Sequence, residues 1–228
     1  MSNLIQISNL SKSFENQKKI RVLKKISYNF EKGKIYSIMG PSGSGKSTLL
    51  NLLSLIDRPT SGSISIENKM INFENTNNND VLRSHKIGII YQQDNLLPDF
   101  TALENIYLAG LAGGNDKRTS ILKTKDLLKK VGLSNRLDHY PSQLSGGERQ
   151  RVSIARALIN NPEIILADEP SGNLDSKNTE TIYNIFWNYR KRFGGTFIID
   201  THDQSLAKGA DKHFIINDGK ISLGKNAK

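Results

Sequence analysis

The chain has 228 residues, no cysteine and a formal net charge of +10 at pH 7. This length accommodates one catalytic unit, a large domain with a subdomain, and a sequence without cysteine excludes disulfides, thiolate metal sites and cysteine catalysis. Its apolar stretches are short and broken by charges, so none approaches the roughly 20 residues that span a bilayer. The start, Met1 to Leu4, has no basic region followed by an apolar core, and we therefore expect no export signal and a cytoplasmic chain.

The positive charge has three interpretations: a nucleic-acid partner, an anionic membrane surface or a lysine-biased composition. The lysines are scattered, as at Lys18-Lys19 and Lys129-Lys130, and they do not alternate with a row of aromatic residues as a strand-binding groove requires. We favour the last two interpretations and expect no direct contact with nucleic acid.

Strand patterns recur along the chain. Residues 1–36 and 62–73 predict short strands of an antiparallel sheet, and residues 35–39, 87–91, 163–167 and 196–200 predict parallel strands of a central sheet. The run from Asn75 to Asn79 is predicted to be an exposed loop. The last two strands, within residues 214–221, are joined by an Asp218-Gly219 turn that is typical of a β-hairpin.

A glycine-rich loop follows the predicted strand 35–39 and opens a leucine-rich segment. It matches the phosphate-binding pattern G-x-x-x-x-G-K-[ST] completely, and the predicted nucleotide-binding residues are Gly40, Pro41, Ser42, Gly43, Ser44, Gly45, Lys46, Ser47 and Thr48. The glycines let consecutive backbone N–H groups face one anion, and the helix start adds the positive end of its dipole. We expect Lys46 to reach the β and γ phosphates and Ser47 to place its hydroxyl on Mg²⁺. The alternative is a Gly/Ser turn before an ordinary helix.

Two carboxylates follow the predicted buried strand 163–167. Asp168 is expected in the Mg²⁺ shell, and Glu169 is expected to orient or deprotonate the water that attacks the γ-phosphate. Alone, the pair would fit an acidic turn after a strand. Together with the Lys46 loop it predicts ATP hydrolysis.

The segment between Gln93 and Pro162 is predicted to be mostly helical, with helices at 101–108, at 120–131 and from Gly146 onward. Ser145 and Glu148 have the spacing of a capping box, which starts the last of these helices. Its glycine-rich start predicts a second anion-binding site in the same chain.

The run Leu144-Ser145-Gly146-Gly147-Glu148-Arg149-Gln150-Arg151 resembles the signature of the ATP-binding cassette (ABC) ATPases, and further elements of that family follow in order along nearly all of the chain. The resemblance implies an α/β P-loop NTPase fold with a RecA-like core, an antiparallel β subdomain and a helical subdomain. Residues 1–228 then form a single domain, in which 1–92 and 163–228 are the core with the β subdomain and 93–162 are the helical signature subdomain.

The resemblance also implies roles for single residues. Ser145, Gly146, Gly147 and Glu148 of one subunit cover the γ-phosphate held by the other, so two chains dock head to tail around two ATP molecules. The loop from Ser171 to Asp175, including Asn173, crosses to the other subunit.

Three further residues match the family pattern. Gln92 matches the glutamine that touches Mg²⁺ and the attacking water, and His202 the histidine that contacts the γ-phosphate and holds Glu169. Phe14 matches the aromatic platform for adenine, although a phenylalanine in such a strand is core about as often as platform.

The helical insert is short and carries no long coiled coil, which resembles transporter-coupled members of the family. Residues 96–105 and 166–175 resemble the group that includes lipoprotein-releasing and macrolide-exporting systems, and the first of these runs favours a lipoprotein-releasing system. This implies two copies at the cytoplasmic face of a bacterial inner membrane, bound peripherally to integral membrane subunits near Leu96, Leu97 and Phe100. Ordinary packing of those three side chains is the alternative. A cell-division ATPase of the family and, more remotely, a nucleic-acid-linked ABC ATPase stay open.

Overall fold

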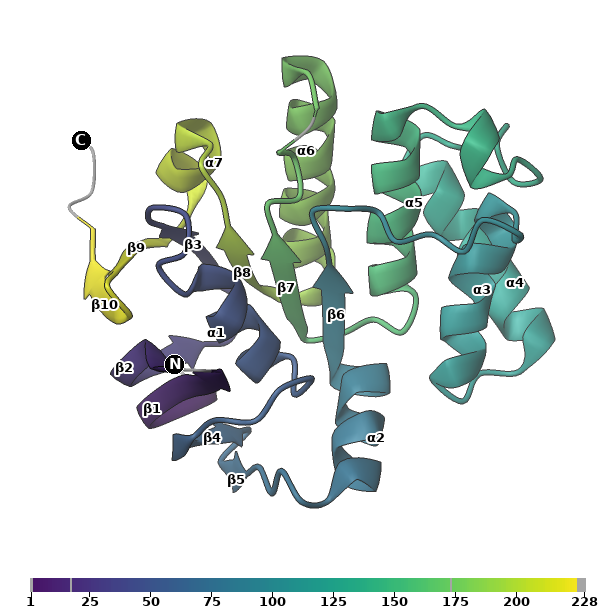
Figure 1. Cartoon of the computed structure of the whole chain (residues 1–228). Coiled ribbons are helices and arrows are strands. Elements are labelled where there is room, and N and C mark those ends of the chain that lie inside the picture. The colour runs from purple at the N-terminus through teal and green to yellow at the C-terminus, as the bar shows by residue number, and fades with distance from the viewer. Residues whose placement is uncertain (1, 17, 173, 225–228) are drawn as a thin grey trace.

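Two β-sheets organise residues 2–16, 18–172 and 174–224, the part of the chain that the computed structural model describes (Figure 1). The larger sheet has the order β10-β9-β3-β8-β7-β6. Its parallel strands are β3 (Ile35–Met39), β6 (Ile87–Ile90), β7 (Ile164–Asp168), β8 (Thr196–Asp200) and β9 (Lys212–Asn217). The predicted parallel strands are thereby confirmed.

The C-terminal hairpin is also confirmed. β9 pairs antiparallel with β10 (Lys220–Leu223). Asp218 and Gly219 form the turn with φ values of 46° and 70°. Two successive left-handed residues match the right-handed twist of the strands they join.

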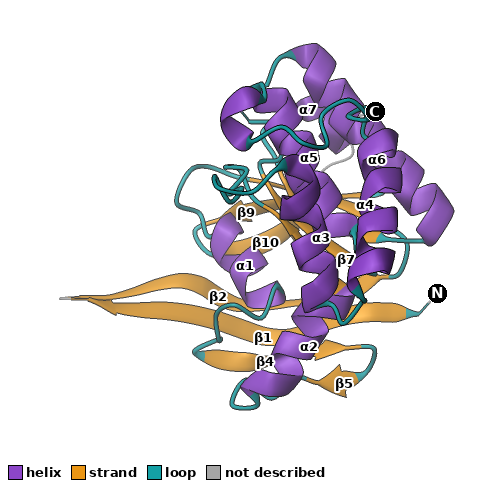
Figure 2. Ribbon diagram, turned by 90° about the vertical axis from the view of Figure 1, so that its right-hand side faces the viewer, coloured by secondary structure: helices purple, strands orange, loops and turns teal. Residues whose placement is uncertain are grey.

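The smaller sheet is antiparallel and has the order β2-β1-β4-β5. β1 (Asn3–Asn16) and β2 (Lys18–Glu31) form a long hairpin (Figure 2), beside β4 (Ser61–Ile66) and β5 (Lys69–Met70). The prediction of short strands was wrong here, because β1 and β2 each continue for 14 residues through several register shifts. One shift lies at Asn9, whose φ of 48° interrupts the strand pattern without ending the strand.

The helices are α1 (Lys46–Leu53), α2 (Thr76–Lys86), α3 (Ala102–Ala112), α4 (Lys117–Lys130), α5 (Gly146–Leu158), α6 (Ser176–Phe193) and α7 (Gln204–Gly209), with a 3₁₀ turn at Pro141–Gln143. The helices predicted in the segment 93–162 are confirmed as α3, α4 and α5. No described helix combines the length with the apolar character needed to cross a bilayer.

The asparagine-rich run is not a loop, which corrects the prediction for residues 75–79. Asn75 caps α2, since its side chain accepts a hydrogen bond from the backbone N–H of Asn78 at 3.2 Å. Asn79 is buried and donates to the carbonyl of Asn72 at 3.0 Å. Side-chain capping therefore overrides the low helix propensity of asparagine.

The two faces of the large sheet bury alternate side chains of the same strands. Leu166 and Ile198 pack in a core shared with α1 and the smaller sheet, whereas Ile165 and Phe197 pack on the opposite side in a core shared with α5 and α6. This pattern is expected of a sheet that is covered on both faces. Burial on both faces fixes the register of the strands, and thereby the height at which each strand ends.

The helical insert has a core of its own between α3, α4 and α5, with Ile106, Leu128 and Val152 fully or almost fully buried. We propose on this basis that residues 93–162 form the helical subdomain. α5 packs against β6, and this contact joins the subdomain to the large sheet.

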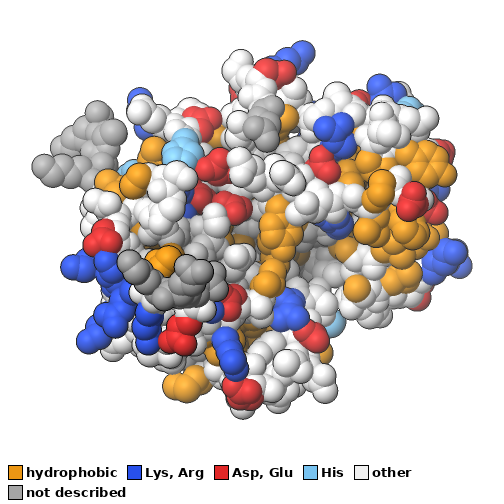
Figure 3. Space-filling view, viewed as in Figure 1, with side chains coloured by type: hydrophobic (Ala, Val, Ile, Leu, Met, Phe, Trp, Pro, Cys, Tyr) orange, Lys and Arg blue, Asp and Glu red, His pale blue; other side chains and the backbone are white. Residues whose placement is uncertain are grey.

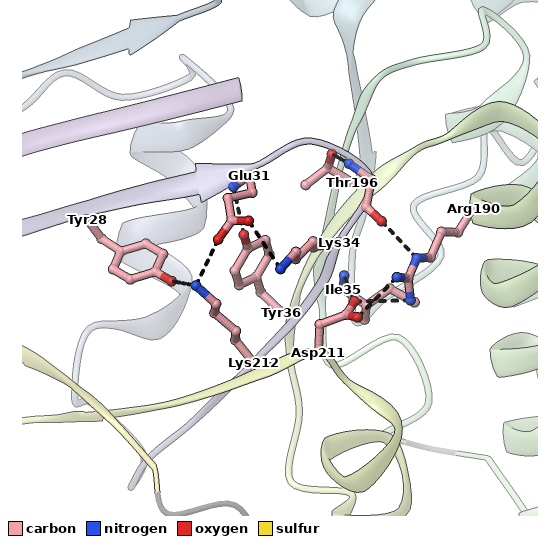
Figure 4. Close-up of polar contacts among 10 residues, drawn as sticks. Tyr28, Glu31, Lys34, Ile35, Tyr36, Arg190, Thr196, Asp211 and Lys212 are labelled. Atoms are coloured by element: carbon pink, nitrogen blue, oxygen red, sulfur yellow. Dashed lines mark hydrogen bonds and ion pairs between the residues drawn. The ribbon is translucent and has the colours of Figure 1, made fainter. Parts of the chain in front are cut away.

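A polar network connects the two sheets at the ends opposite the glycine-rich loop (Figure 4). Lys212 at the start of β9 donates to Glu31 at 2.9 Å and to Tyr28 at 3.0 Å. The Lys212 and Lys34 ammonium groups lower the pKa of Glu31. The end of β2 is thereby held against the starts of β3 and β9.

Candidate active site

The glycine-rich loop between β3 and α1 depends on close approach of the backbone to its neighbours. Gly45 is the N-cap of α1 with φ 108°, and a Cβ added there would lie 2.7 Å from Leu23 Cδ2. A Cβ on Gly40 would lie 2.1 Å from the carbonyl oxygen of Ile216. Only glycine fits these two positions, so β2 and β9 shape the loop from behind.

The side chain of Lys46 lies inside the loop. Its exposed fraction is 6%, and its Nζ donates to the carbonyl oxygens of Gly40 at 3.0 Å and Pro41 at 3.3 Å. Asp200 Oδ2 lies 3.9 Å away. The loop therefore surrounds a cation at the N-terminus of a helix, and both features favour an anion in front of it.

A pocket of about 410 Å³ opens in front of this loop. The C-terminal ends of β7 and β8 and the loop after β6 complete it (Figure 1). Its lining residues are Val22, Ser42, Gly43, Gly45, Lys46, Ser47, Thr48, Gln92, Asp168, Glu169, Asp200 and His202. Segments from five parts of the chain thus meet at the edge where parallel strands end, as is usual for ligand sites in α/β folds.

The carboxylates after β7 are held by the neighbouring segments. Ser47 Oγ donates to Asp168 Oδ1 at 3.2 Å, and Gln92 Nε2 donates to Glu169 Oε2 at 3.1 Å. His202 Nε2 lies 3.0 Å from the other oxygen, Oε1, of Glu169. A carboxylate only accepts hydrogen bonds, so His202 Nε2 carries the hydrogen in this contact. Both oxygens of Glu169 are oriented from opposite sides.

The backbone of Glu169 is strained. Its φ is 43°, in the left-handed region that residues with a Cβ rarely adopt. The backbone N–H of Glu169 donates to the carbonyl of Asp200 at 3.0 Å, and its own carbonyl accepts from Gly172 at 3.0 Å. Such strain persists only where the surroundings impose it, and it turns the side chain into the pocket.

Asp200 is a site residue that the sequence patterns did not single out. It is 1% exposed, and its Oδ1 has no hydrogen-bond partner among the described residues. Burial raises the pKa of Asp200 to about 8, with Lys46 opposing the shift and Asp168 adding to it. One feature of the sequence could have identified Asp200 as a site residue: two predicted parallel strands each end in an aspartate. In the structure, the register of β7 and β8 pairs Asp168 with Asp200.

The glycine-rich start of α5 lies outside this pocket. The predicted capping box is confirmed: the backbone N–H of Ser145 donates to Glu148 Oε2 at 2.8 Å, and Ser145 Oγ accepts from the backbone N–H of Glu148 at 3.2 Å. Arg136 Nε donates to Glu148 Oε1 at 2.8 Å, and this contact together with the box lowers the pKa of Glu148 to about 2. Both oxygens of Glu148 are thus engaged within the insert.

Ser145 and Gly146 are exposed, and the first turn of a helix has backbone N–H groups without intrahelical acceptors. Gly147 is required by packing, because a Cβ there would lie 2.6 Å from Asn178 Oδ1. The first turn of α6, which Asp175 caps, therefore packs closely against the start of α5. Asn173 lies outside the described residues.

Phe14 does not line the pocket. Its ring is 43% exposed, and Lys12 Nζ lies 4.9 Å from the ring centre. Val22, on the neighbouring strand, lines the pocket instead. The adenine-platform role of Phe14 stays a prediction.

The donor types fit Mg²⁺ and a nucleotide. A serine hydroxyl, a carboxylate and an amide oxygen are the hard oxygen ligands that Mg²⁺ uses when phosphates and water complete its shell, and Ser47, Asp168 and Gln92 supply them. Ser44 Oγ, buried in the loop, has no hydrogen-bond partner among the described residues. An unpaired hydroxyl beside Lys46 suits a phosphate oxygen.

Comparisons with known proteins agree with this geometry. A family model described as ABC transporter matches residues 23–172. The lipoprotein-releasing system ATP-binding protein LolD of Cytophaga hutchinsonii is 42% identical over 221 residues, which are 97% of this chain and 100% of the relative. LolD of Bacteroides fragilis is 42% identical over 218 residues, which are 96% of this chain and 100% of the relative.

Solved structures give the same result. The dimeric, post-hydrolysis structure of the ATP-binding cassette MJ0796 bound to ADP and Pi is similar with a TM-score of 0.92 at 37% identity, and the match covers 99% of this chain and 100% of that one. A dimeric structure of MJ0796 described as a bacterial ABC transporter cassette gives 0.91 at 38% identity with the same coverage. The predicted P-loop NTPase fold of the ABC type and the predicted ATPase activity are thereby confirmed. The chain belongs to the ABC transporter family, as an ATP-binding and ATP-hydrolysing subunit.

Proposed function

We propose that this ATPase drives the release of lipoproteins from a bacterial inner membrane, as a pair of copies bound to integral membrane subunits at the cytoplasmic face. The name and the 42% identity of the LolD relatives, matched over nearly their full length, support this choice within the family. A macrolide exporter and a cell-division ATPase are the alternatives within the same family.

The observation that carries the ATPase mechanism is the convergence of Lys46, Ser47, Asp168, Glu169 and His202 on one pocket. We infer that Lys46 and the backbone N–H groups of its loop bind the β and γ phosphates of ATP. Ser47 and Asp168, with Gln92, would hold Mg²⁺, which neutralises charge that develops on the phosphates.

Glu169 is placed to orient the attacking water and accept its proton, because its two oxygens are directed by Gln92 and His202. His202 keeps the carboxylate turned toward the γ-phosphate position. Little covalent chemistry is required of the protein, so positioning and charge account for most of the rate.

The start of α5 does not reach the Lys46 pocket of its own chain, and this supports a dimer. Ser145, Gly146 and Gly147 do not line the Lys46 pocket of their own subunit, and Ser145 and Gly146 are exposed. We propose that they cover the phosphates held by a second copy, and the dimeric relatives support this arrangement. Binding of ATP then closes the pair and hydrolysis loosens it.

Light scattering after size exclusion tests both the site and the dimer. The Glu169→Gln protein keeps every phosphate contact but loses the proton acceptor, so we expect ATP without magnesium to convert it from monomer to dimer. Lys46→Ala, in the same background, should stay monomeric with ATP because it binds the nucleotide at least ten-fold more weakly. A Glu169→Gln protein that hydrolyses ATP at the normal rate would contradict the catalytic assignment.

The insert presents an apolar surface that suits the membrane subunits (Figure 3). Leu97, Phe100 and Tyr140 are 46%, 37% and 45% exposed. We propose that a short cytoplasmic helix of the membrane partner packs there, beside the loop that begins at Gln92. Leu97→Glu should abolish co-purification with the membrane subunits while ATP binding persists. Leu122→Glu, which changes a leucine on α4 that is 61% exposed, is the matched control.

The cargo is tested with proteoliposomes that contain the membrane subunits encoded beside this chain and an acylated lipoprotein. ATP should move the lipoprotein into the soluble fraction in the presence of a soluble acceptor, and the Glu169→Gln protein should not support this release. Stimulation of the ATPase by a macrolide, without release of the lipoprotein, would favour the exporter instead.

A further inference from the structure

A tyrosine hydroxyl joins the two loops that carry Glu169 and His202. Tyr183 projects from α6, and its OH lies 2.9 Å from Ser171 Oγ and 2.9 Å from Asp203 Oδ2. Ser171 follows Glu169 by two residues, and Asp203 directly follows His202. The Tyr183 hydroxyl thus contacts both the loop after β7 and the loop after β8. The ends of these two strands lie next to each other in Figure 1.

The direction of these hydrogen bonds is determined by chemistry. A carboxylate only accepts, so Tyr183 donates to Asp203 and its oxygen accepts from Ser171. Burial raises the pKa of Tyr183 to about 12, so the phenol keeps its hydrogen at any pH at which the enzyme works. Asp203 is itself fixed, because its Oδ1 accepts from the backbone N–H and the hydroxyl of Ser205 at 2.7 Å and 2.6 Å. The loop that carries His202 and Asp203 is therefore the fixed end of this chain of hydrogen bonds.

A pocket of about 640 Å³ lies beside the bridge. The two loops line it together with α6, and its lining includes Glu169, Ser171, Tyr183, His202 and Asp203. The segment after Glu169 also contains Gly172, whose φ and ψ are the least restricted of any residue type. The hydroxyl of Tyr183 therefore links the Ser171 loop to the Asp203 loop beyond the point where the pairing of β7 with β8 ends.

We propose that Tyr183 is a positioning residue for ATP hydrolysis, which acts by holding the Ser171 loop to the Asp203 loop so that Glu169 and His202 stay in contact. This inference rests on the proposed roles of Glu169 and His202. Tyr183 itself does not line the pocket in front of Lys46, so it acts through these two residues and not on the nucleotide.

The variant Tyr183→Phe removes the bridging oxygen and keeps the ring. We expect kcat for ATP hydrolysis to fall about three- to ten-fold, while KM for ATP and the melting temperature stay close to the wild-type values. Tyr189→Phe is the matched control. Tyr189 lies on the same helix, and its OH donates to the carbonyl of Pro162 at 2.9 Å, in the core away from the pocket. Equal kcat values for the two variants would overturn the proposal.

Ser171 provides a second, independent test, which remains available if Tyr183→Phe folds poorly. Ser171→Ala removes the other end of the bridge and should lower kcat to a similar extent, whereas Ser171→Thr keeps the hydroxyl and should restore it. The double variant Ser171→Ala/Tyr183→Phe should be no slower than either single variant, because both remove the same connection. If the fold-loss of kcat in the double variant equals the product of the two single losses, Ser171 and Tyr183 do not act through a shared bridge.

The Glu169→Gln protein separates failure of this inference from failure of the proposed function. If Glu169→Gln is inactive and Tyr183→Phe has the wild-type kcat, the positioning role alone is wrong. If Glu169→Gln hydrolyses ATP normally, the proposed catalytic role is wrong, and the positioning role is lost with it.

Discussion

Glycine occupies two positions of the phosphate loop for different physical reasons. Gly43 has φ 74°, and a Cβ added there would meet nothing within 4 Å. Gly45 has φ 108°, and a Cβ there would lie 2.7 Å from Leu23 and 3.1 Å from the carbonyl of Val22. Gly43 is needed only because its backbone is left-handed. Gly45 is needed for the same reason and also because a side chain there would clash with β2.

This difference predicts the effect of alanine at each position. Gly43→Ala should lower the free energy of unfolding by about 1 kcal/mol, the cost of a left-handed residue that carries a Cβ. Gly45→Ala should cost roughly 2–4 kcal/mol, because the loop or β2 must also move. Urea unfolding without nucleotide measures both values. Similar losses for the two variants would show that the clash with Leu23 is relieved at no cost.

Polar side chains decide where helices begin in this chain. Asn75 caps α2 in a run that looks like a linker. Asn75→Ala should lower the free energy of unfolding by about 1 kcal/mol, since it leaves an N–H of the first turn without its acceptor. Asn77→Ala, in the same turn but exposed and without a capping role, is the control. Thermal unfolding of the two variants should separate them by several degrees, and equal melting temperatures would contradict the cap.

Glu148 links the start of α5 to Arg136 in a pH-dependent way. The pKa of Glu148 is lowered to about 2 in the folded chain from an ordinary value of 4.5, so the folded state binds its proton less readily than the unfolded state. The contact therefore stabilises the fold above about pH 4.5, and this contribution is lost as the pH falls toward 2.

Glu148→Gln keeps an amide oxygen for the capping box but removes the charge. We expect a loss of stability on the order of 0.5–1 kcal/mol at pH 7, which shrinks toward zero as the pH is lowered below 4. Urea unfolding of both proteins at pH 7, 5 and 3.5 measures the difference. A constant difference across this range would mean that Arg136 does not stabilise the charge.

At the scale of the whole molecule, the net charge of +10 does not by itself identify a partner. Many of the positive groups are already paired, as Lys24 is with Asp218, Arg190 with Asp211, and both Lys32 and Lys86 with Glu163. We therefore expect no binding to duplex DNA at about 150 mM salt, measured by fluorescence anisotropy with a labelled duplex. Micromolar binding with a steep salt dependence would support the nucleic-acid-linked alternative.

The sequence by itself determined the features that depend on neighbouring residues. The phosphate loop, the carboxylates after β7, the capping box of α5 and the Asp218-Gly219 turn are each encoded in a few consecutive positions, because backbone conformation and local hydrogen bonds operate over that distance. Short apolar runs predicted the parallel strands in the same way, and the resemblance of residues 144–151 to the ABC signature indicated the family.

Only the tertiary structure decided which distant residues meet. Asp200 became part of the site because the register of β7 and β8 sets it beside Asp168. Tyr183 meets Ser171 and Asp203 because α6 packs beside the loops that carry them. The lengths of β1 and β2 and the helix at Asn75 likewise depended on pairing, burial and capping contacts that composition does not reveal. The physical reason is the same in each case: these contacts join segments that are remote in the chain, and no local pattern specifies a contact of that kind.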